Sequence, residues 1–463
     1  MIDINSNHPE YNLSIDKWSE MRDTVEGEEA IKNAGITYLP KPSGMSDSEY
    51  NAYKKRAVFY GGTGRTIEGM TGLMFRIPVS YNAMDISNYG GMFGKTYSDI
   101  VHKSAIEVLI TGRVGVLVDY PDINTEGMSV ADKEALGINP YAVVYQAEQI
   151  VNWQISEFGT LTDVVLEYRE IKNGKYEKFR KHLLIDEGRY TVVTYAEDKS
   201  GGNNSEVKYV RASRIQPLMN GSGMTYIPFT FINSNDLSVD VGKPPLLDLA
   251  NVNVSMYRNS ADYEHGLHWV ALPTPIFKGA GDAELRIGSS TGINLPTDGD
   301  AFMLEFTGAG LTQLSDSMSN KRSDMATLGS RMLATDKKAV ETAETANIHR
   351  AGESATLQTI ANNLSRGLTI VLRTIVTWDG ITNADDYTVN INTDYNPSKI
   401  DSNTIMALLA SVQAGRIAQE DFISALQDGE IIDRDRDAQE ILQEAQDELE
   451  MTGANNNNTG LEL

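Results

Sequence analysis

The strongest helical pattern in the chain lies in its last third. Apolar residues recur there every three or four positions, the spacing of one face of an α-helix. A helix from Lys338 to Trp378 would be about 60 Å long at ~1.5 Å per residue. Its first half is rich in Ala, Thr, Glu and Asn, so we expect neighbouring subunits, rather than one globule, to cover it. The apolar face comprises Leu357, Ile360, Ala361, Leu364, Leu368, Val371, Leu372 and Ile375.

A coiled coil is the alternative explanation of this segment. Gly352 and Gly367 interrupt the pattern, and apolar residues do not keep a sustained heptad flanked by charged pairs. We therefore favour a single long helix.

The N-terminal half changes from helical to strand patterns. Helical spacing predicts helices at Ser14–Glu20 and Ser46–Phe75, separated by the proline-rich linker "LPKPSGMSDSE". From Ile100 to Leu237 the pattern is typical of strands, and the turn Asn173-Gly174 predicts a hairpin. The second strand of this hairpin carries Lys175, Lys178, Arg180 and Lys181. Lysines commonly protect an exposed sheet edge, which is the interpretation that we favour over a partner-binding surface.

A helix–insertion–helix pattern follows. We expect helices at 242–270 and 311–333, and between them a segment rich in proline and glycine with few strands, 271–310. Two helices that flank a small insertion form a hairpin-like protrusion with little core of its own. We therefore expect this protrusion to pack against other copies of the chain.

Composition places the chain among soluble globular proteins. It has 463 residues, 41% of them hydrophobic and 22% charged, and no cysteine. We expect neither a membrane span nor export, because no apolar run reaches about 18 residues and the N-terminus lacks a signal pattern. The lack of cysteine excludes disulfides and thiolate zinc sites.

The net charge of −24 gives no bulk attraction to phosphate. The acid is concentrated in 417–450, where twelve acidic residues face Arg434 and Arg436. This segment is interpreted as a solvated helical face. A surface that must not hold DNA is the alternative.

Two motifs suggest nucleotide chemistry but lack its requirements. The sequence "YGGTGRT", 60–66, resembles a phosphate loop, and "VGVLVDY" ends a strand in Asp119 as a Walker B element would. A phosphate loop needs a lysine after its last glycine and a strand before it. Here Arg65 follows Gly64 and a helix precedes the motif, so we favour glycines that allow close helix packing.

The segment "YEHGLHW" is a possible metal site. Glu264, His265 and His268 fall on neighbouring turns of a helix, but the HExxH spacing is absent and metal sites need three convergent ligands. Polar helix residues beside an aromatic ring are the favoured interpretation. The chain also lacks a cysteine nucleophile and a Gly-x-Ser-x-Gly elbow. We therefore expect no enzyme, no cofactor and no metal.

The order of these segments resembles one protein family. The stretches concerned include "RAVFYGGTGRTIEGMTGLMFRIP", "ITGRVGVLVDYP", "GKPPLLDLANVNVSMYRNSADYEHGLH", "ETAETANIHRAGESATLQTIANNLS" and "LLASVQAGRIAQEDFISAL". Together they are similar to the portal, or head-to-tail connector, proteins of tailed bacteriophages, in a group formerly catalogued as a domain of unknown function. No single stretch encodes chemistry, so the resemblance rests on their joint order.

The resemblance implies an α+β portal fold with named parts. These would be a wing at 1–241, helical to about 80 and then β-rich; stem helices at 242–270 and 311–333; a clip at 271–310; a tunnel loop and long helix at 334–378; a wing return strand at 379–396; and a crown with a disordered-type tail at 397–463.

The resemblance also implies a ring, usually of twelve subunits, at one vertex of the capsid. It would conduct double-stranded DNA during packaging and ejection, be assembled in the bacterial cytoplasm and contact no membrane. Its partners would be the terminase, the head–tail adaptor and the major capsid protein. The alternatives are another virion structural protein, such as a minor head or adaptor protein, and an enzyme.

The tunnel loop would contain Thr335, Asp336, Lys337 and Lys338. A lysine pair at the start of a helix is disfavoured by the helix dipole. In a ring, the two lysines would form a narrow basic girdle that contacts DNA phosphates without reading sequence. A solvated lysine pair in a turn is the alternative.

Overall fold

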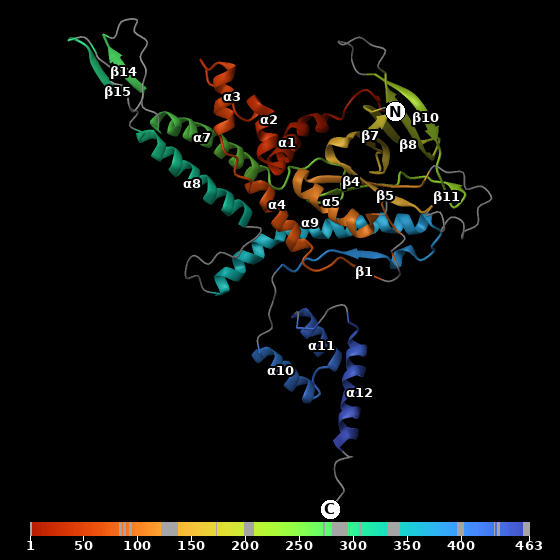
Figure 1. The fold of residues 1–463 in the computed structure, drawn as a ribbon. Coiled ribbons are helices and arrows are strands. Elements are labelled where there is room, and N and C mark those ends of the chain that lie inside the picture. The colour runs from red at the N-terminus through yellow and green to blue at the C-terminus, as the bar shows by residue number, and fades with distance from the viewer. Residues whose placement is uncertain are drawn as a thin grey trace, which may run out of the picture. The chain divides into compact units, whose positions relative to one another are not determined.

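The computed structural model shows a mixed helical and β-sheet chain in two compact units, Met1–Thr393 and Asp394–Leu463 (Figure 1). The expected mixture of helices and sheets is thus confirmed. The structure describes residues 2–82, 86, 89–91, 95–121, 138–172, 174–198, 208–271, 274–279, 295, 297–304, 308–330, 343–395, 402–429, 431–432 and 436–456.

The N-terminal helices differ in extent from those predicted. The predicted helix 46–75 is two helices, separated by the non-helical residues 57–61. There the Ser260 hydroxyl accepts a hydrogen bond from the Val58 N–H (2.9 Å) and donates one to the Val58 carbonyl (2.7 Å), replacing helical bonds. The elements are α1 (Pro9–Glu26), α2 (Glu28–Ala34), η1 (Gly35–Thr37), α3 (Asp47–Arg56) and α4 (Gly62–Met74).

The strand-rich region begins later than Ile100, which corrects the prediction. Helix α5 (Tyr97–Thr111) begins with a capping box, in which the Thr96 hydroxyl accepts from the Asp99 N–H and the Asp99 carboxylate accepts from the Thr96 N–H. It ends at Gly112, which has φ +79°. Both are standard helix boundary signals.

A five-stranded antiparallel sheet has the order β10-β9-β8-β7-β6. The predicted hairpin is confirmed, because Lys172 of β7 pairs with Lys175 of β8 across the turn that contains Gly174. The strands are β6 (Ile150–Ile155), which follows η2 (Ala147–Gln149), β7 (Leu161–Lys172), β8 (Lys175–Asp186), β9 (Arg189–Glu197) and β10 (Tyr209–Ile215).

The basic strand β8 is not an edge strand, so the interpretation of its lysines as edge protection is wrong. Its cations pair with carboxylates: Lys178 and Arg180 each lie 3.2 Å from Glu167, and Lys181 lies 3.2 Å from Asp119. Arg180 is buried. The charge pattern therefore reflects cross-strand and inter-sheet pairing.

Helix α9 (Ala343–Trp378) packs against a three-stranded sheet, β13-β4-β5, and against α5. All the apolar-face residues predicted from the spacing, from Leu357 to Ile375, are buried. A Cβ on Gly367 would lie 2.5 Å from Ile232 Cγ1, so this glycine permits the close contact with β13. The strands are β4 (Arg113–Asp119), β5 (Tyr141–Gln146) and β13 (Phe229–Asn233).

A short strand returns beside α9. β16 (Thr388–Asn390), which follows η3 (Ala384–Asp386), pairs antiparallel with β1 (Ser80–Asn82). The hydroxyls of Thr369 and Ser365 accept hydrogen bonds from the backbone N–H groups of Val389 and Ile391, each at 3.0 Å. Side chains of α9 are thereby hydrogen-bonded to the backbone of β16 and of the residue that follows it.

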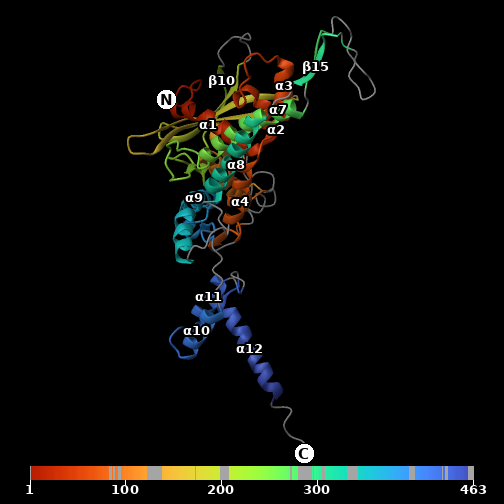
Figure 2. The same ribbon diagram turned by 90° about the vertical axis from the view of Figure 1, so that its left-hand side faces the viewer.

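Helices α7 (Leu247–Ala271) and α8 (Ala309–Ser330) lie side by side (Figures 1 and 2). Beyond their ends is a two-stranded ribbon of β14 (Thr274–Lys278) and β15 (Asp300–Leu304) in a segment expected to contain few strands. The remaining small strands pair as β2 (Gly90–Gly91) with β3 (Lys95–Thr96) and β11 (Leu218–Met219) with β12 (Ser222–Gly223).

The second unit contains α10 (Ser402–Gln413), α11 (Gln419–Asp428) and α12 (Ala438–Asn456). Ile423 of α11 is buried, whereas no side chain of α10 is. α12 runs into the asparagine-rich segment expected to be a tail, and 457–463 lie outside the described residues. In the described part of the chain, no helix is long and apolar enough to cross a bilayer.

Candidate functional site: the α7–α8 hairpin

A methionine-rich seam joins α7 and α8. Met256 of α7 packs with Met318 and Met325 of α8 in a buried cluster that also contains Leu249. Methionine side chains are flexible and adapt to irregular gaps. Two polar contacts cross the same seam: Asn259 donates to the Ser317 hydroxyl (2.9 Å) and Lys321 donates to the Ser255 carbonyl (3.2 Å). The two helices are therefore held along one side of each.

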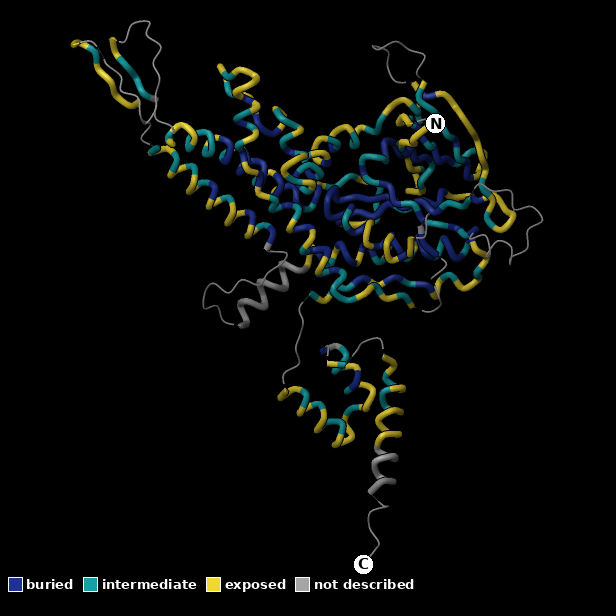
Figure 3. The backbone as a smooth tube through the Cα atoms, in the orientation of Figure 1, coloured by how far each residue is buried: buried dark blue, intermediate teal, exposed yellow. Residues whose placement is uncertain are grey.

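Away from α7 and α4, the described residues of α8 are largely exposed. Among the described residues of α8, those that are buried are Met318, Met325 and Gly329 (Figure 3). The ribbon at the end of the hairpin is even less covered, because every residue of β15 is exposed. Phe302, Met303 and Leu304 retain 49%, 53% and 45% of their accessible surface. Contiguous exposed apolar residues of this kind mark interaction surfaces.

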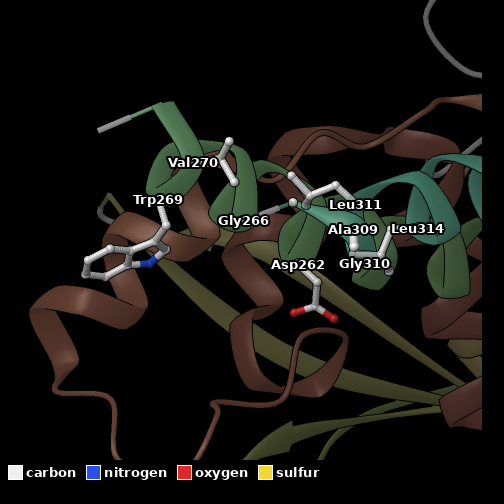
Figure 4. Close-up of a pocket in the computed structure, with 9 residues that line it drawn as sticks. Asp262, Gly266, Trp269, Val270, Ala309, Gly310, Leu311 and Leu314 are labelled. Atoms are coloured by element: carbon white, nitrogen blue, oxygen red, sulfur yellow. The ribbon is translucent and has the colours of Figure 1, made fainter. Parts of the chain in front are cut away.

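An apolar cavity of about 570 Å³ lies where α7 ends and α8 begins (Figure 4). A Cβ on Gly266 would lie 2.5 Å from Leu311 Cδ2, so the glycine is needed for this close approach. The carboxylate at the wall, Asp262, accepts a hydrogen bond from the Tyr53 hydroxyl at 2.5 Å. Burial and this bond raise the pKa of Tyr53. The lining residues are Asp262, Gly266, Trp269, Val270, Gly308, Ala309, Gly310, Leu311 and Leu314.

His265 lies between two donors near this cavity. The Arg56 guanidinium is 3.1 Å from its Nδ1, and the Trp269 indole N–H is 3.1 Å from its Nε2. A neutral imidazole accepts at one nitrogen only, so it satisfies one donor at a time. Burial, and then the charges of Arg56 and His268, lower the pKa of His265. The charges of Arg56 and His268 thus favour the neutral form of the His265 imidazole.

The predicted contact of polar helix residues with an aromatic ring is confirmed. His265 and His268 both pack edge-on against Trp269, with centroid distances of 6.0 and 6.3 Å. Among the described residues, no group of three or more His, Asp or Glu side chains could hold a metal ion.

The loop that resembles a phosphate loop is used for packing. Gly62 begins α4, and its N–H donates to Asn253 Oδ1 on α7 at 3.1 Å. A Cβ on Gly62 would lie 2.9 Å from that oxygen, and one on Gly64 would lie 2.9 Å from the Val25 carbonyl oxygen. Close packing of α4 against α7 and α1 is thus confirmed. Asp119 pairs with Lys181.

The predicted tunnel-loop residues Thr335, Asp336, Lys337 and Lys338 lie outside the described residues. The described part of α9 begins at Ala343. Sequence reasoning missed the cavity, although glycines at 266, 308 and 310 beside Leu311 were visible in the sequence. Their meeting depends on the fold, because α7 and α8 are separated by the β14–β15 segment.

Comparisons with known proteins place a family match on this hairpin. Residues 245–379, from α7 through α9, match the family described as Domain of unknown function (DUF4055). No curated protein matches the chain.

Two solved structures resemble the chain with low sequence identity and low TM-scores. One, "Virion of native gene transfer agent (GTA) particle", has 12% identity and a TM-score of 0.37 and covers 83% of this chain and 94% of that chain. The other, "Neck of native GTA particle computed with C12 symmetry", has 11% identity and a TM-score of 0.40 and covers 85% and 98%. The family match, by itself, confirms over 245–379 the resemblance to a group catalogued as a domain of unknown function.

Proposed function

We propose that this protein is a portal: copies form a ring at one capsid vertex, through which double-stranded DNA is packaged and ejected. The observation that carries the proposal is the exposed surface of α8 and of the β14–β15 ribbon at its end. α8 is buried on one side only, and the ribbon at its end exposes Phe302, Met303 and Leu304. A closed ring of head-to-tail contacts covers such surfaces in every copy at once.

The second unit supports assembly independently. Its α10 has no buried side chain, yet it carries Met406 and Leu409, which are 63% and 42% exposed. A small helical unit that leaves apolar residues in water has little stability of its own. Contacts between copies would bury these residues, as a crown would.

The charge of the chain fits a conduit better than a DNA-binding protein. A net charge of −24 gives no bulk attraction to phosphate, and a duplex that slides must not be held tightly. Within this proposal, the β14–β15 ribbon is the clip that docks the terminase and later the head–tail adaptor. The rest of the ring faces the major capsid protein, and the protein acts without catalysis.

Electron microscopy of the purified chain tests the proposal. Negative-stain images are expected to show rings with a central hole, and native mass spectrometry is expected to give twelve copies. A well-folded monomer that forms no ring at any concentration would contradict the proposal. A chain that assembles only on a ring formed by another protein would instead be an adaptor.

The lysine pair of the proposed tunnel loop has its own test. Replacing Lys337 and Lys338 by alanine is expected to reduce DNA retention in filled heads, most clearly at low salt, because phosphate contacts weaken with ionic strength. Replacing Lys54 and Lys55, an adjacent pair on α3, by alanine is the matched control. Retention equal to that of the wild type at every salt concentration would remove the DNA role of Lys337 and Lys338.

A further inference from the structure

Two arginines flank one exposed tyrosine on the side of the body where α4 meets α8. The guanidinium carbons of Arg65 and Arg322 each lie 5.6 Å from the centre of the Tyr60 ring. The ring is 40% exposed, and both arginines are exposed. Arginines favour this position because the face of an aromatic ring attracts cations. We call these three residues the arginine–tyrosine patch.

The positive charge of this patch is uncompensated in the described part of the chain. Neither Arg65 nor Arg322 forms an ion pair there, although Glu68 follows Arg65 on α4 and Asp324 follows Arg322 on α8. The two guanidinium groups carry like charges beside the same Tyr60 side chain, so they repel each other. In a chain of net charge −24, such a pair is best explained by an anionic partner.

A complementary surface exists elsewhere on the same body. A cavity of about 570 Å³ between α1, η1 and α7 is lined by Asp16, Glu20 and Asp23, with Arg258 as its cation. Arg258 donates its Nε–H to the Tyr38 carbonyl at 2.7 Å, and Asp23 accepts from the Tyr38 hydroxyl at 2.6 Å. Burial raises the pKa of Glu20, and the charge of Arg258 offsets this in part. We call this the α1 acidic pocket.

The two surfaces lie on different sides of α7. Val254 lines the α1 acidic pocket, whereas Met256 packs against α8, which carries Arg322. Residues two apart are about 200° apart around a helix with 3.6 residues per turn. The patch and the pocket therefore cannot meet within one copy, but they can meet between two copies.

We propose that the arginine–tyrosine patch of one copy docks on the α1 acidic pocket of the next copy. This inference rests on the proposed ring of subunits. It specifies the contact that fixes how each subunit is oriented relative to the next one. Contact between different surfaces of identical copies repeats head to tail and closes when the rotation between copies allows it. The opposite charges also prevent patch-to-patch or pocket-to-pocket pairing, since like charges then meet.

Charge reversal of the full-length protein tests the contact. The variant R65E/R322E and the variant D16K/E20K are each expected to raise the protein concentration needed for ring formation about tenfold or more. The combined variant R65E/R322E/D16K/E20K restores opposite charges at every contact and is expected to form rings near the wild-type concentration. Thermal denaturation shows that each subunit is folded, and K208E/R211E, two exposed cations just before and within β10, is the matched control.

The outcomes separate this inference from the proposed function. Rings of R65E/R322E at the wild-type concentration would overturn the inference and leave the portal proposal intact. If those rings also lost DNA retention, the patch would be a nucleic-acid contact instead. Failure of the combined variant to recover would likewise overturn the pairing. A wild-type protein that forms no ring would remove the portal proposal, and the inference with it.

Discussion

Helices α9 and α8 belong to the same matched segment but have opposite environments. From Leu357 onward, α9 buries its whole apolar face against β13, β16 and α5. α8 buries Met318 and Met325 against α7 and exposes most of the rest. The first helix is part of the folding core, whereas the second is exposed and, in the proposed ring, faces a neighbouring copy. The difference indicates which substitutions should unfold the subunit and which should affect only assembly.

The largest expected effect is on subunit stability. Leu364→Ala in α9 removes a fully buried side chain, so we expect a loss of about 2–5 kcal/mol in the free energy of unfolding. Leu314→Ala in α8 is the matched control, because that side chain is half-buried at the cavity and should cost about 1 kcal/mol. Urea denaturation of dilute subunits measures both. Equal losses of unfolding free energy in the two variants would show that α8 contributes as much to the folding core as α9 does.

Glycines give a second pair of variants. Gly367→Ala places a Cβ 2.5 Å from Ile232, so overpacking should cost about 1–3 kcal/mol. Gly310→Ala in α8 meets nothing within 4 Å and should be neutral or stabilising by about 0.5 kcal/mol. Thermal denaturation compares them. A stable Gly367→Ala variant would show that α9 is less tightly packed against β13 than the structure indicates.

The charged core of the five-stranded sheet gives a pH-dependent prediction. Burial alone would raise the pKa of Glu167, but Lys178 and Arg180 lower it below its ordinary value of 4.5. Glu167 therefore stabilises the fold above pH 4.5, and this contribution is lost as pH falls through its folded pKa. Glu167→Gln should cost about 2 kcal/mol at pH 7. The difference from wild type should shrink below pH 4.5 in denaturation curves; a constant difference would refute the ion-pair role.

The smallest expected effect on the subunit concerns the exposed ribbon. Phe302→Ser with Leu304→Ser should change the free energy of unfolding by about 1 kcal/mol or less, because the two residues already expose 49% and 45% of their accessible surface. Ring formation, measured by native mass spectrometry, should nevertheless decrease. Unchanged rings would show that β15 does not contact a neighbouring copy.

Regular local patterns allowed part of the fold to be predicted. The buried face of α9 followed from its spacing, and the hairpin followed from Asn173-Gly174. α5 was missed although Thr96, Asp99 and Gly112 carried boundary signals, because its buried apolar residues lead almost directly into the buried strand β4.

Other features depend on contacts that no local pattern contains. The break between α3 and α4 needs Ser260, which lies far along the chain, to bond both backbone groups of Val58. The central position of β8 depends on strand order, so its cations were misread as edge protection. The cavity forms where Gly266 meets Leu311, which only the antiparallel pairing of α7 and α8 brings together.

The hydroxyls of Ser365 and Thr369 have a mechanical consequence. They fasten β16 to α9, and β16 is paired in turn with β1. A push along the axis of α9 is therefore transmitted to the strand just before Thr393, where the first unit ends. The two hydroxyl contacts thus couple the position of β16 to that of α9.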